Sequence, residues 1–280
     1  MAALVSPGDA LGIPTEEIPA AKRDSGATDH TEERKTLMSL SQPAIVLVHG
    51  AWADASSWNS VIPRLQQRGF TVYAPPNPLR GLPQDSAYVH QFLTQNAALQ
   101  GQPVVLVGHS YGGAVITNAA VGAPGVRALV YVDAFIPDEG DTIGGLASAE
   151  PGSCLGNEAF NPVPYPGAPS GDVDLYIKPD LVPGCFATGL PASQAALIAA
   201  TQRPLTASAF TGPSGPPAWK TIPSWAVVGS GDRVIPPAEL TFMAKRAGAR
   251  ITDVDAGHLS LISEAPVVTR VILEAVEATG

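Results

Sequence analysis

The chain has 280 residues, of which 45% are hydrophobic, so it can bury the core of one large domain or of a domain with an insertion. Lysine and arginine number 16 against 25 aspartate and glutamate residues, which gives a formal net charge of −9. This balance, without any run of basic residues, argues against a protein that binds nucleic acid or an anionic membrane surface.

The sequence shows no pattern of a targeting signal, and it contains two cysteines. No apolar stretch approaches the roughly 18 residues of a membrane-spanning helix, and the N-terminus lacks the residue order of a signal peptide. We therefore expect no membrane association, and the cytoplasm is the favoured location. Cys154 and Cys185 lack the partner ligands of a structural zinc site, so they are either free thiols or one disulfide.

Apolar runs of strand length alternate with helical patterns from residue 43 onward. Residues 1–42 show neither period and are predicted to form a flexible extension. The predicted strands are Ala44–Val48, Thr71–Ala74, Val104–Val107, Ala128–Val132, Trp225–Val228 and Arg250–Val254. The predicted helices are Ser57–Arg68, Ser86–Leu99, Tyr111–Val121, Pro237–Ala247 and Ala265–Ala278. The alternation predicts an α/β fold with a mostly parallel central sheet flanked by helices.

A long, proline-rich connection interrupts this alternation between the fourth and fifth strands. Residues 138–218 are predicted to form an inserted cap over one end of the sheet, and residues 43–137 and 219–280 to form the core. Within the cap, Ala192–Thr201 is predicted to be a helix and Asp172–Ile177 a short strand or helix. The proline-rich segment 160–172 is predicted to be a loop.

The segment "VVLVGHSYGGAVI" (104–116) joins a predicted strand to a predicted helix through a glycine-rich turn. Ser110 occupies the sharpest point of that turn, in the pattern Gly-x-Ser-x-Gly. Glycine is needed on both sides because a Cβ atom there would strike the neighbouring strand and helix. The strand, turn and helix in succession distinguish this motif from an incidental serine and predict that Ser110 is a nucleophile.

A serine hydroxyl attacks well only when a base removes its proton and a third group orients that base. His258 follows the last predicted strand directly and reaches the same edge of the sheet as Ser110, so it is the predicted base. The other four histidines lie in the extension, at the end of the first strand, within a helix and beside the serine: His30, His49, His90 and His109.

Two aspartates end predicted strands, and the chain order of serine, acid and histidine admits either as the orienting acid. Asp232 is preferred because its strand is expected to lie next to the strand that precedes His258. Asp133 is the alternative acid; otherwise it lines the mouth of the pocket or caps the turn at Pro137.

Acyl transfer also needs amide donors aimed at the oxyanion that forms on the substrate carbonyl. The backbone N–H of Tyr111, directly after the nucleophile, is one predicted donor. The other is the backbone N–H of Ala51 in the "HGAW" segment after the first strand, where Gly50 permits an unusual backbone angle.

Three segments carry a resemblance to a known family: "IVLVHGAWADASSW" (45–58), "VVLVGHSYGGAVI" (104–116) and "GHLSLISEAP" (257–266). The chain resembles the α/β-hydrolase superfamily, and within it the small serine esterases that include plant methyl-ester hydrolases, plant hydroxynitrile lyases and bacterial α/β-fold hydrolases. The resemblance implies a capped fold with a triad of Ser110, Asp232 and His258, oxyanion donors at Ala51 and Tyr111, and no cofactor or metal. It does not extend residue by residue into the proline-rich cap.

The predicted activity is hydrolysis of small to medium, fairly apolar carboxylic esters, with the ester as a small-molecule partner. Four aromatic residues are predicted to line the substrate pocket, or else to be ordinary core: Trp52, Phe135, Tyr165 and Phe186. Lactone or amide hydrolysis, or carbon–carbon lyase chemistry on the same triad, is the first alternative, and a non-catalytic small-molecule receptor is the second. A lyase like those of plants would carry a lysine near the base, and "DAGHLSL" has none.

Overall fold

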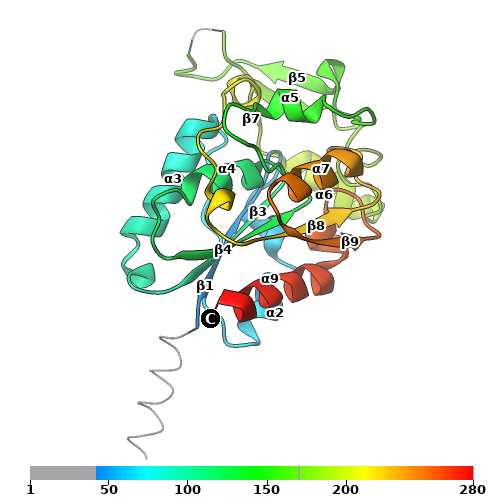
Figure 1. Cartoon of the computed structure of the whole chain (residues 1–280). Coiled ribbons are helices and arrows are strands. Elements are labelled where there is room, and N and C mark those ends of the chain that lie inside the picture. The colour runs from blue at the N-terminus through cyan, green and yellow to red at the C-terminus, as the bar shows by residue number, and fades with distance from the viewer. Residues whose placement is uncertain (1–41, 170, 280) are drawn as a thin grey trace, which may run out of the picture. The chain divides into compact units, whose positions relative to one another are not determined.

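A six-stranded sheet forms the centre of the computed structural model, which describes residues 42–169 and 171–279 (Figure 1). The strands are β1 (Ala44–Val48), β2 (Val72–Tyr73), β3 (Val104–His109), β4 (Val126–Val132), β8 (Ser224–Gly229) and β9 (Arg250–Val254). Their order is β2-β1-β3-β4-β8-β9, and every neighbouring pair is parallel. The predicted α/β class is thus confirmed, whereas the predicted extension, apart from Gln42, lies outside the described residues.

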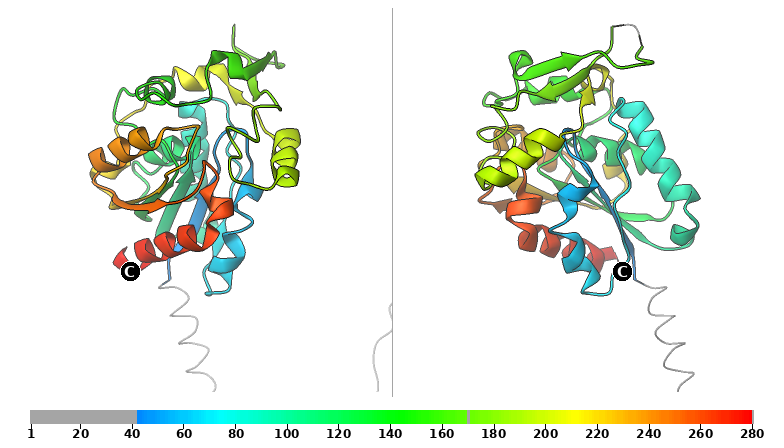
Figure 2. Two further views of the ribbon diagram at one scale, coloured as in Figure 1. Left: turned by 90° about the vertical axis from the view of Figure 1, so that its right-hand side faces the viewer. Right: turned by 180° about the vertical axis from the view of Figure 1, so that it is seen from behind.

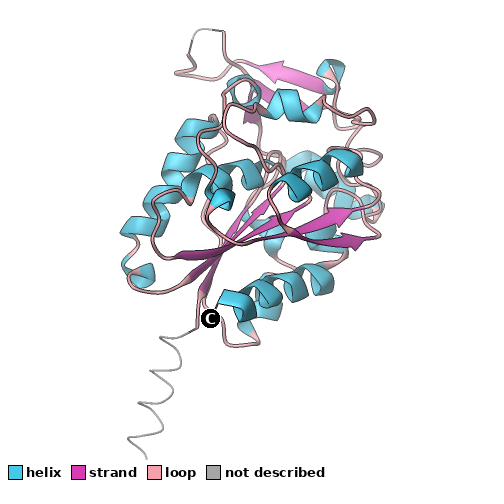
Figure 3. Ribbon diagram, in the orientation of Figure 1, coloured by secondary structure: helices cyan, strands magenta, loops and turns pink. Residues whose placement is uncertain are grey.

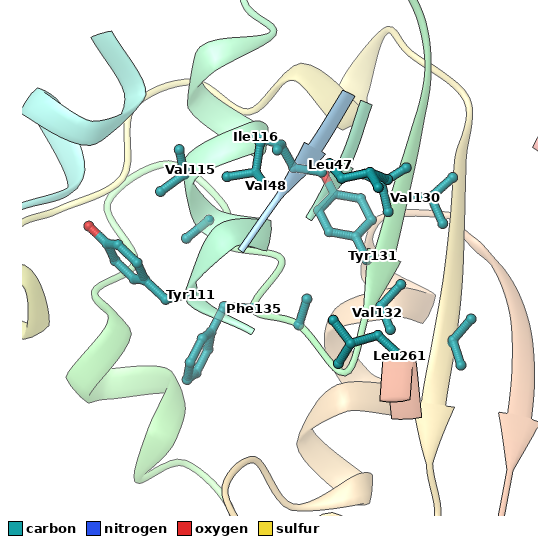
Figure 4. Close-up of a cluster of buried hydrophobic side chains, with 14 of the residues drawn as sticks. Leu47, Val48, Tyr111, Val115, Ile116, Val130, Tyr131, Val132, Phe135 and Leu261 are labelled. Carbon is teal, nitrogen blue, oxygen red and sulfur yellow. The ribbon is translucent and has the colours of Figure 1, made fainter. Parts of the chain in front are cut away.

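The inner strands are buried along their whole length because helices cover both faces of the sheet. Every residue of β1, β3 and β8 is buried, which explains why these strands appear in the sequence as continuous apolar runs. Figure 4 shows side chains from β1, α4 and β4, among them Leu47, Ile116 and Val130, packed into one cluster. Continuous apolar packing of this kind fixes the strand ends that carry the site.

Two layers of helices enclose the sheet (Figures 2 and 3). One face is covered by α2 (Ile62–Gln66) and α9 (Ala265–Thr279), and the other by α3 (Leu82–Gln95), α4 (Tyr111–Ala119) and α7 (Pro237–Arg246). Shorter helices are η1 (Ala55–Trp58), η2 (Ala97–Leu99), η5 (Ala218–Lys220) and α8 (Ser260–Ser263). None of the helices in the described ranges has both the length and the apolar character needed to cross a bilayer.

Two helices differ most from their predicted bounds, whereas the other three predicted core helices end within two residues of their predicted ends. The predicted helix 57–68 is split into η1 and α2. The Asp54 carboxylate caps η1 by accepting the Ser56 N–H at 2.7 Å, and a separate helix begins at Ile62 with Pro63 in its first turn. Helix α3 starts at Leu82, four residues earlier than predicted, with Pro83 in its first turn and Gly81 before it at φ 116°.

The cap contains a small antiparallel sheet in the order β5-β6-β7. Its elements are α5 (Ile143–Ala147), η3 (Asn157–Ala159), β5 (Phe160–Val163), β6 (Asp174–Ile177), α6 (Ala192–Thr201), β7 (Leu205–Thr206) and η4 (Ala207–Phe210). The predicted helix 192–201 is confirmed, and 174–177 is a strand. The loop prediction was wrong for 160–163, which form β5: this is an edge strand, where the missing N–H of Pro162 breaks no ladder. The cap boundaries at 138 and 218 stay a prediction.

A disulfide between Cys154 and Cys185 joins two segments of the cap. The two Cα atoms are 5.9 Å apart although the residues are separated by 31 positions in the sequence. Of the two states that the sequence leaves open for these cysteines, the structure contains the bridged one.

Candidate active site

Ser110 lies in a strained turn between β3 and α4, with φ 53° and ψ −124°. Neighbouring backbone leaves no space for side chains beside it. A Cβ atom on Gly108 would come within 2.6 Å of the Gly112 carbonyl oxygen, and one on Gly112 within 2.5 Å of the Val48 carbonyl oxygen. The two glycines therefore let strand, turn and helix pack closely enough to hold Ser110 in its unusual conformation.

Positive φ angles at residues other than glycine gather around this turn. Within the described part of the chain they occur at Trp52, Leu79, Ser110 and Asp133. Ser110 and Asp133 directly follow β3 and β4, and Trp52 lies in the loop after β1, so three of the four lie beyond the ends of neighbouring parallel strands. Such backbone strain persists where surrounding structure enforces it, and it marks this edge of the sheet as a candidate functional site.

Three side chains predicted from the sequence meet at this edge. The Ser110 hydroxyl lies 2.8 Å from His258 Nε2, and His258 Nδ1 lies 2.7 Å from Asp232 Oδ2. The second Asp232 oxygen, Oδ1, accepts the N–H groups of Val234 and Ile235 at 2.7 and 3.0 Å. Because the carboxylate is held at both oxygens, the imidazole is oriented with Nε2 facing the serine.

Two further histidines support this arrangement without touching the serine hydroxyl. His109 Nε2 donates to the His258 carbonyl oxygen at 2.9 Å, and burial lowers the pKa of His109 well below its ordinary value. His49 Nε2 accepts the Asn77 N–H at 2.9 Å while its Nδ1 donates to the Gly50 carbonyl oxygen. Both rings are therefore neutral and hold backbone segments in place by hydrogen bonds: His109 holds the His258 backbone, and His49 holds the loop after β1.

The alternative acid, Asp133, makes a different set of contacts. Its carboxylate accepts the Gly229 N–H at 2.8 Å, the Ser260 hydroxyl at 2.5 Å and the Ser260 N–H at 3.2 Å. The imidazole of His258 hydrogen-bonds to Asp232 instead. Burial, together with the nearby charge of Asp232, raises the pKa of Asp133 to about 7. Asp133 thus ties the end of β4 to the loop that carries His258.

The two predicted oxyanion donors lie beside the nucleophile. Ala51 and Tyr111 line the same small cavity as Ser110. Across residues 42–169 and 171–279, no protein group accepts a hydrogen bond from the backbone N–H of either residue. Two amides without an acceptor next to a buried hydroxyl are a suitable receptor for negative charge on a carbonyl oxygen.

The cavity over Ser110 is small and apolar. It measures about 30 Å³, and its lining includes Trp52, Phe135, Ile143, Leu155, Phe210 and Val234. Among the residues that the structure describes, no charged side chain lines it. Trp52 and Phe135 therefore lie where the sequence predicts pocket residues. Phe210 was missed, because it comes from the short helix η4 in a cap segment without periodic pattern.

The other two aromatic residues predicted for the pocket lie elsewhere. Phe186 packs against the His258 ring, with 5.5 Å between centroids, and lines a separate groove of about 220 Å³ on the outer side of Trp52. Tyr165 does not line the cavity, because the Arg80 guanidinium packs 4.6 Å over its ring and its hydroxyl donates to Asp172. Of the four predicted pocket residues, Trp52 and Phe135 therefore line the cavity over Ser110, and Phe186 and Tyr165 do not.

Comparisons with known proteins identify relatives that are hydrolases by name. A carbendazim-hydrolyzing esterase from a Nocardioides strain is 37% identical over 109 residues, which make up 35% of this chain and 44% of the relative. The match therefore spans less than half of that relative's length.

Solved structures of similar fold include a pyrethroid hydrolase from Sphingobium faniae and a methylesterase from Arabidopsis. The first has a TM-score of 0.66 at 21% identity and covers 84% of this chain and 98% of the hydrolase. The second has a TM-score of 0.67 at 18% identity and covers 84% of this chain and 99% of the methylesterase. At such low identity these likenesses establish the fold alone.

The family assignment comes from a match over most of the chain. A model of the alpha/beta hydrolase family matches residues 45–270, which contain the turn at Ser110, the Asp232 loop and His258. With its parallel sheet and matching segment order, the chain belongs to the alpha/beta hydrolase family.

Proposed function

We propose that this protein is a serine hydrolase that cleaves small to medium, fairly apolar carboxylic esters. The observation that carries the proposal is the continuous hydrogen-bonded series from Ser110 Oγ through the His258 ring to Asp232. All three side chains are almost completely buried, at 2%, 0% and 4% exposure, so their interactions are little screened by water.

In the proposed reaction, Ser110 Oγ attacks the ester carbonyl carbon while His258 Nε2 takes the hydroxyl proton. Asp232 holds the Nδ1 proton and stabilises the imidazolium that forms. The negative charge on the carbonyl oxygen is stabilised by the backbone N–H groups of Ala51 and Tyr111. The tetrahedral intermediate then collapses, and His258 returns its proton to the leaving alcohol.

A water molecule completes the cycle by the same steps. His258 removes a proton from the water as the oxygen attacks the acyl carbon, and the second tetrahedral intermediate expels Ser110 Oγ. Ser110 recovers its proton from His258, and the carboxylic acid is released. No step needs a metal or a redox partner, and every proton is accounted for by the imidazole.

The lining of the cavity favours a neutral acyl group. Aliphatic and aromatic side chains form its walls, and no lysine or arginine is present to balance a substrate carboxylate. Transfer of a charged group into such a site without a partner costs several kcal/mol or more. We therefore expect simple neutral esters to react and esters with a charged acyl group to be rejected.

The test compares wild-type protein with Ser110→Ala on p-nitrophenyl acetate and butyrate. The wild type should release nitrophenolate and react with a fluorophosphonate probe at Ser110, whereas the variant should do neither. Ser224→Ala serves as a matched control, because Ser224 is also buried but its hydroxyl donates to the Ile222 carbonyl within the core. A wild type that neither turns over nor is labelled at Ser110 would refute the proposal.

A further inference from the structure

A buried carboxylate outside the triad contacts the residue that follows the nucleophile. Asp85, on α3, is fully buried, and its Oδ2 accepts the Tyr111 hydroxyl at 2.8 Å. The backbone N–H groups of Arg80 and Gly81 donate to the same carboxylate at 2.9 and 3.2 Å. Burying an acid is costly, and the proposed reaction makes no direct use of this one. We therefore looked for a role of Asp85 in its contact with Tyr111.

Tyr111 borders the cavity and is anchored by its hydroxyl to Asp85. The residue is 1% exposed and lines the cavity, and its backbone N–H has no acceptor among the described residues. Figure 4 shows the ring extending from the start of α4, with the hydroxyl at its far end. The hydrogen bond to Asp85 fixes that far end. A rigid side chain anchored in this way restricts rotation of the first turn of α4.

We propose that Asp85 is a positioning residue, which acts through the Tyr111 hydroxyl to keep the Tyr111 amide aimed at the oxyanion. This inference rests on the proposed function, because an oxyanion forms only during acyl transfer. An amide displaced by a fraction of an ångström loses much of its stabilisation of the developing charge. Asp85 and Tyr111 would therefore contribute to the transition state more than to binding of the ester.

The same turn that gives two amides to Asp85 also holds the cap. Leu79 has a positive φ of 60°, and its carbonyl oxygen accepts the Thr206 N–H of β7 at 3.2 Å. The Arg80 guanidinium forms an ion pair with Asp174 of β6. The turn 79–81 thus connects the cap sheet to Asp85, and through it to Tyr111. A docked cap and an aligned amide are parts of one contact network.

The variant Tyr111→Phe tests the proposal because it removes only the hydroxyl and keeps the ring. We expect kcat on p-nitrophenyl butyrate to fall about tenfold, less than the loss of a whole oxyanion donor, with KM little changed. A phenylboronic acid forms a tetrahedral adduct with a serine hydroxyl and so mimics the oxyanion state. Its affinity should fall by a similar factor, whereas an uncharged product analogue should bind as before.

The matched control is Tyr131→Phe. Tyr131 is equally buried, and its hydroxyl lies 3.0 Å from Thr117 Oγ1 on the same helix but away from the cavity. Both variants lose one buried hydrogen bond, so thermal melting should show similar losses of stability. Of these two variants, only Tyr111→Phe should show a lower kcat and a weaker boronate affinity. Asp85→Ala should show the same two losses.

The possible outcomes separate this inference from the proposed function. Equal kcat and equal boronate affinity in the folded Tyr111→Phe and Tyr131→Phe variants would overturn the positioning role while leaving the hydrolase intact. An inactive wild type that the fluorophosphonate does not label would overturn the proposed function, and the positioning role with it.

Discussion

Two buried aspartates near the imidazole differ in what their carboxylates touch. Asp232 accepts a hydrogen bond from His258 Nδ1 at 2.7 Å, whereas Asp133 binds Gly229 and Ser260. In the proposed reaction only the first can hold the imidazole in the tautomer that accepts the serine proton. The second fixes the backbone on which the histidine is carried. The two residues should therefore respond differently to the same substitution.

We expect Asp232→Asn to lower kcat by about 10³- to 10⁴-fold while the protein remains folded. Asparagine keeps the shape of the side chain but can donate to Nδ1, which favours the wrong tautomer. Steady-state kinetics on p-nitrophenyl butyrate, together with circular dichroism as a check on folding, measure the effect.

Asp133→Asn is the comparison for this experiment. We expect a loss of only about tenfold, because Asp133 acts on the loop rather than on the ring. Equal losses in the two variants would reassign the orienting acid to Asp133.

The three side chains that meet at this edge could be identified from the sequence because their signals are local, and their catalytic roles stay a proposal. Ser110 is defined by a turn of five residues between strand and helix, and His258 by its place after the last strand. The placement of Tyr165 depends instead on a cation–π contact with Arg80, 85 positions away in the sequence, and periodicity carries no information on such contacts. Asp85 was missed for the same reason, since its partner Tyr111 lies on another helix.

At the scale of elements, the disulfide connects cap segments on two sides of the site. Cys154 N–H donates to the Arg233 carbonyl at 2.8 Å, next to Asp232, and the Arg233 guanidinium donates to the Gly184 carbonyl at 2.8 Å. Phe186, which follows Cys185, packs on the His258 ring. The bridge therefore restrains the surroundings of both the acid and the base.

Reduction of the bridge should lower stability and activity together. For a closed loop of about 30 residues, loss of the cross-link removes about 3 to 4 kcal/mol, or roughly 10 °C in melting temperature. We expect dithiothreitol to lower the melting temperature and kcat of the wild type, but to leave the Cys154→Ser, Cys185→Ser double variant unchanged. Two free thiols in the unreduced wild type under denaturing conditions would contradict the bridge.

The sequence predicted core elements better than cap elements. Core strands such as β1 and β3 are buried on both faces, so their apolar runs stand out from the flanking turns. Strand β5 is an edge strand in which only Phe160 is even half-buried, and it contains a proline, which makes it indistinguishable from a loop by composition. The split between η1 and α2 depends on the Asp54 cap, a single side-chain hydrogen bond.

For the whole molecule, two buried histidines predict a dependence of folding on pH. Burial lowers the pKa of His49 to about 4 from an ordinary value of 6.5. The unfolded chain therefore binds a proton below about pH 6.5, whereas the folded chain resists protonation until about pH 4. Stability is fully present above pH 6.5 and is lost as the pH falls toward 4, by about 3 kcal/mol for His49.

His49→Gln should reduce this dependence. Glutamine retains an acceptor for the Asn77 N–H but does not titrate, so the free energy of unfolding should fall less between pH 7 and about pH 4.5 than in the wild type. Urea unfolding at several pH values measures the slope. His109 titrates in both proteins and cancels in the difference. Identical slopes would show that His49 does not contribute.

The bridge also bears on where the whole protein works. Disulfides persist in oxidising compartments and are rare in the reducing cytosol. The cytoplasmic location favoured by the sequence stays a prediction, and the redox state of this bridge in the cell would test it. Thiol titration of the protein isolated from its native cells distinguishes the two environments.

The small size of the cavity over Ser110 has a kinetic consequence. A space of about 30 Å³ admits about two water molecules and is too narrow for an ester with its alcohol. We therefore expect the cap walls to move outward when such a molecule enters. If this motion is slower than the chemical step, kcat should fall as the viscosity of the solvent rises. Added sucrose should then lower kcat more for fast substrates than for slow ones.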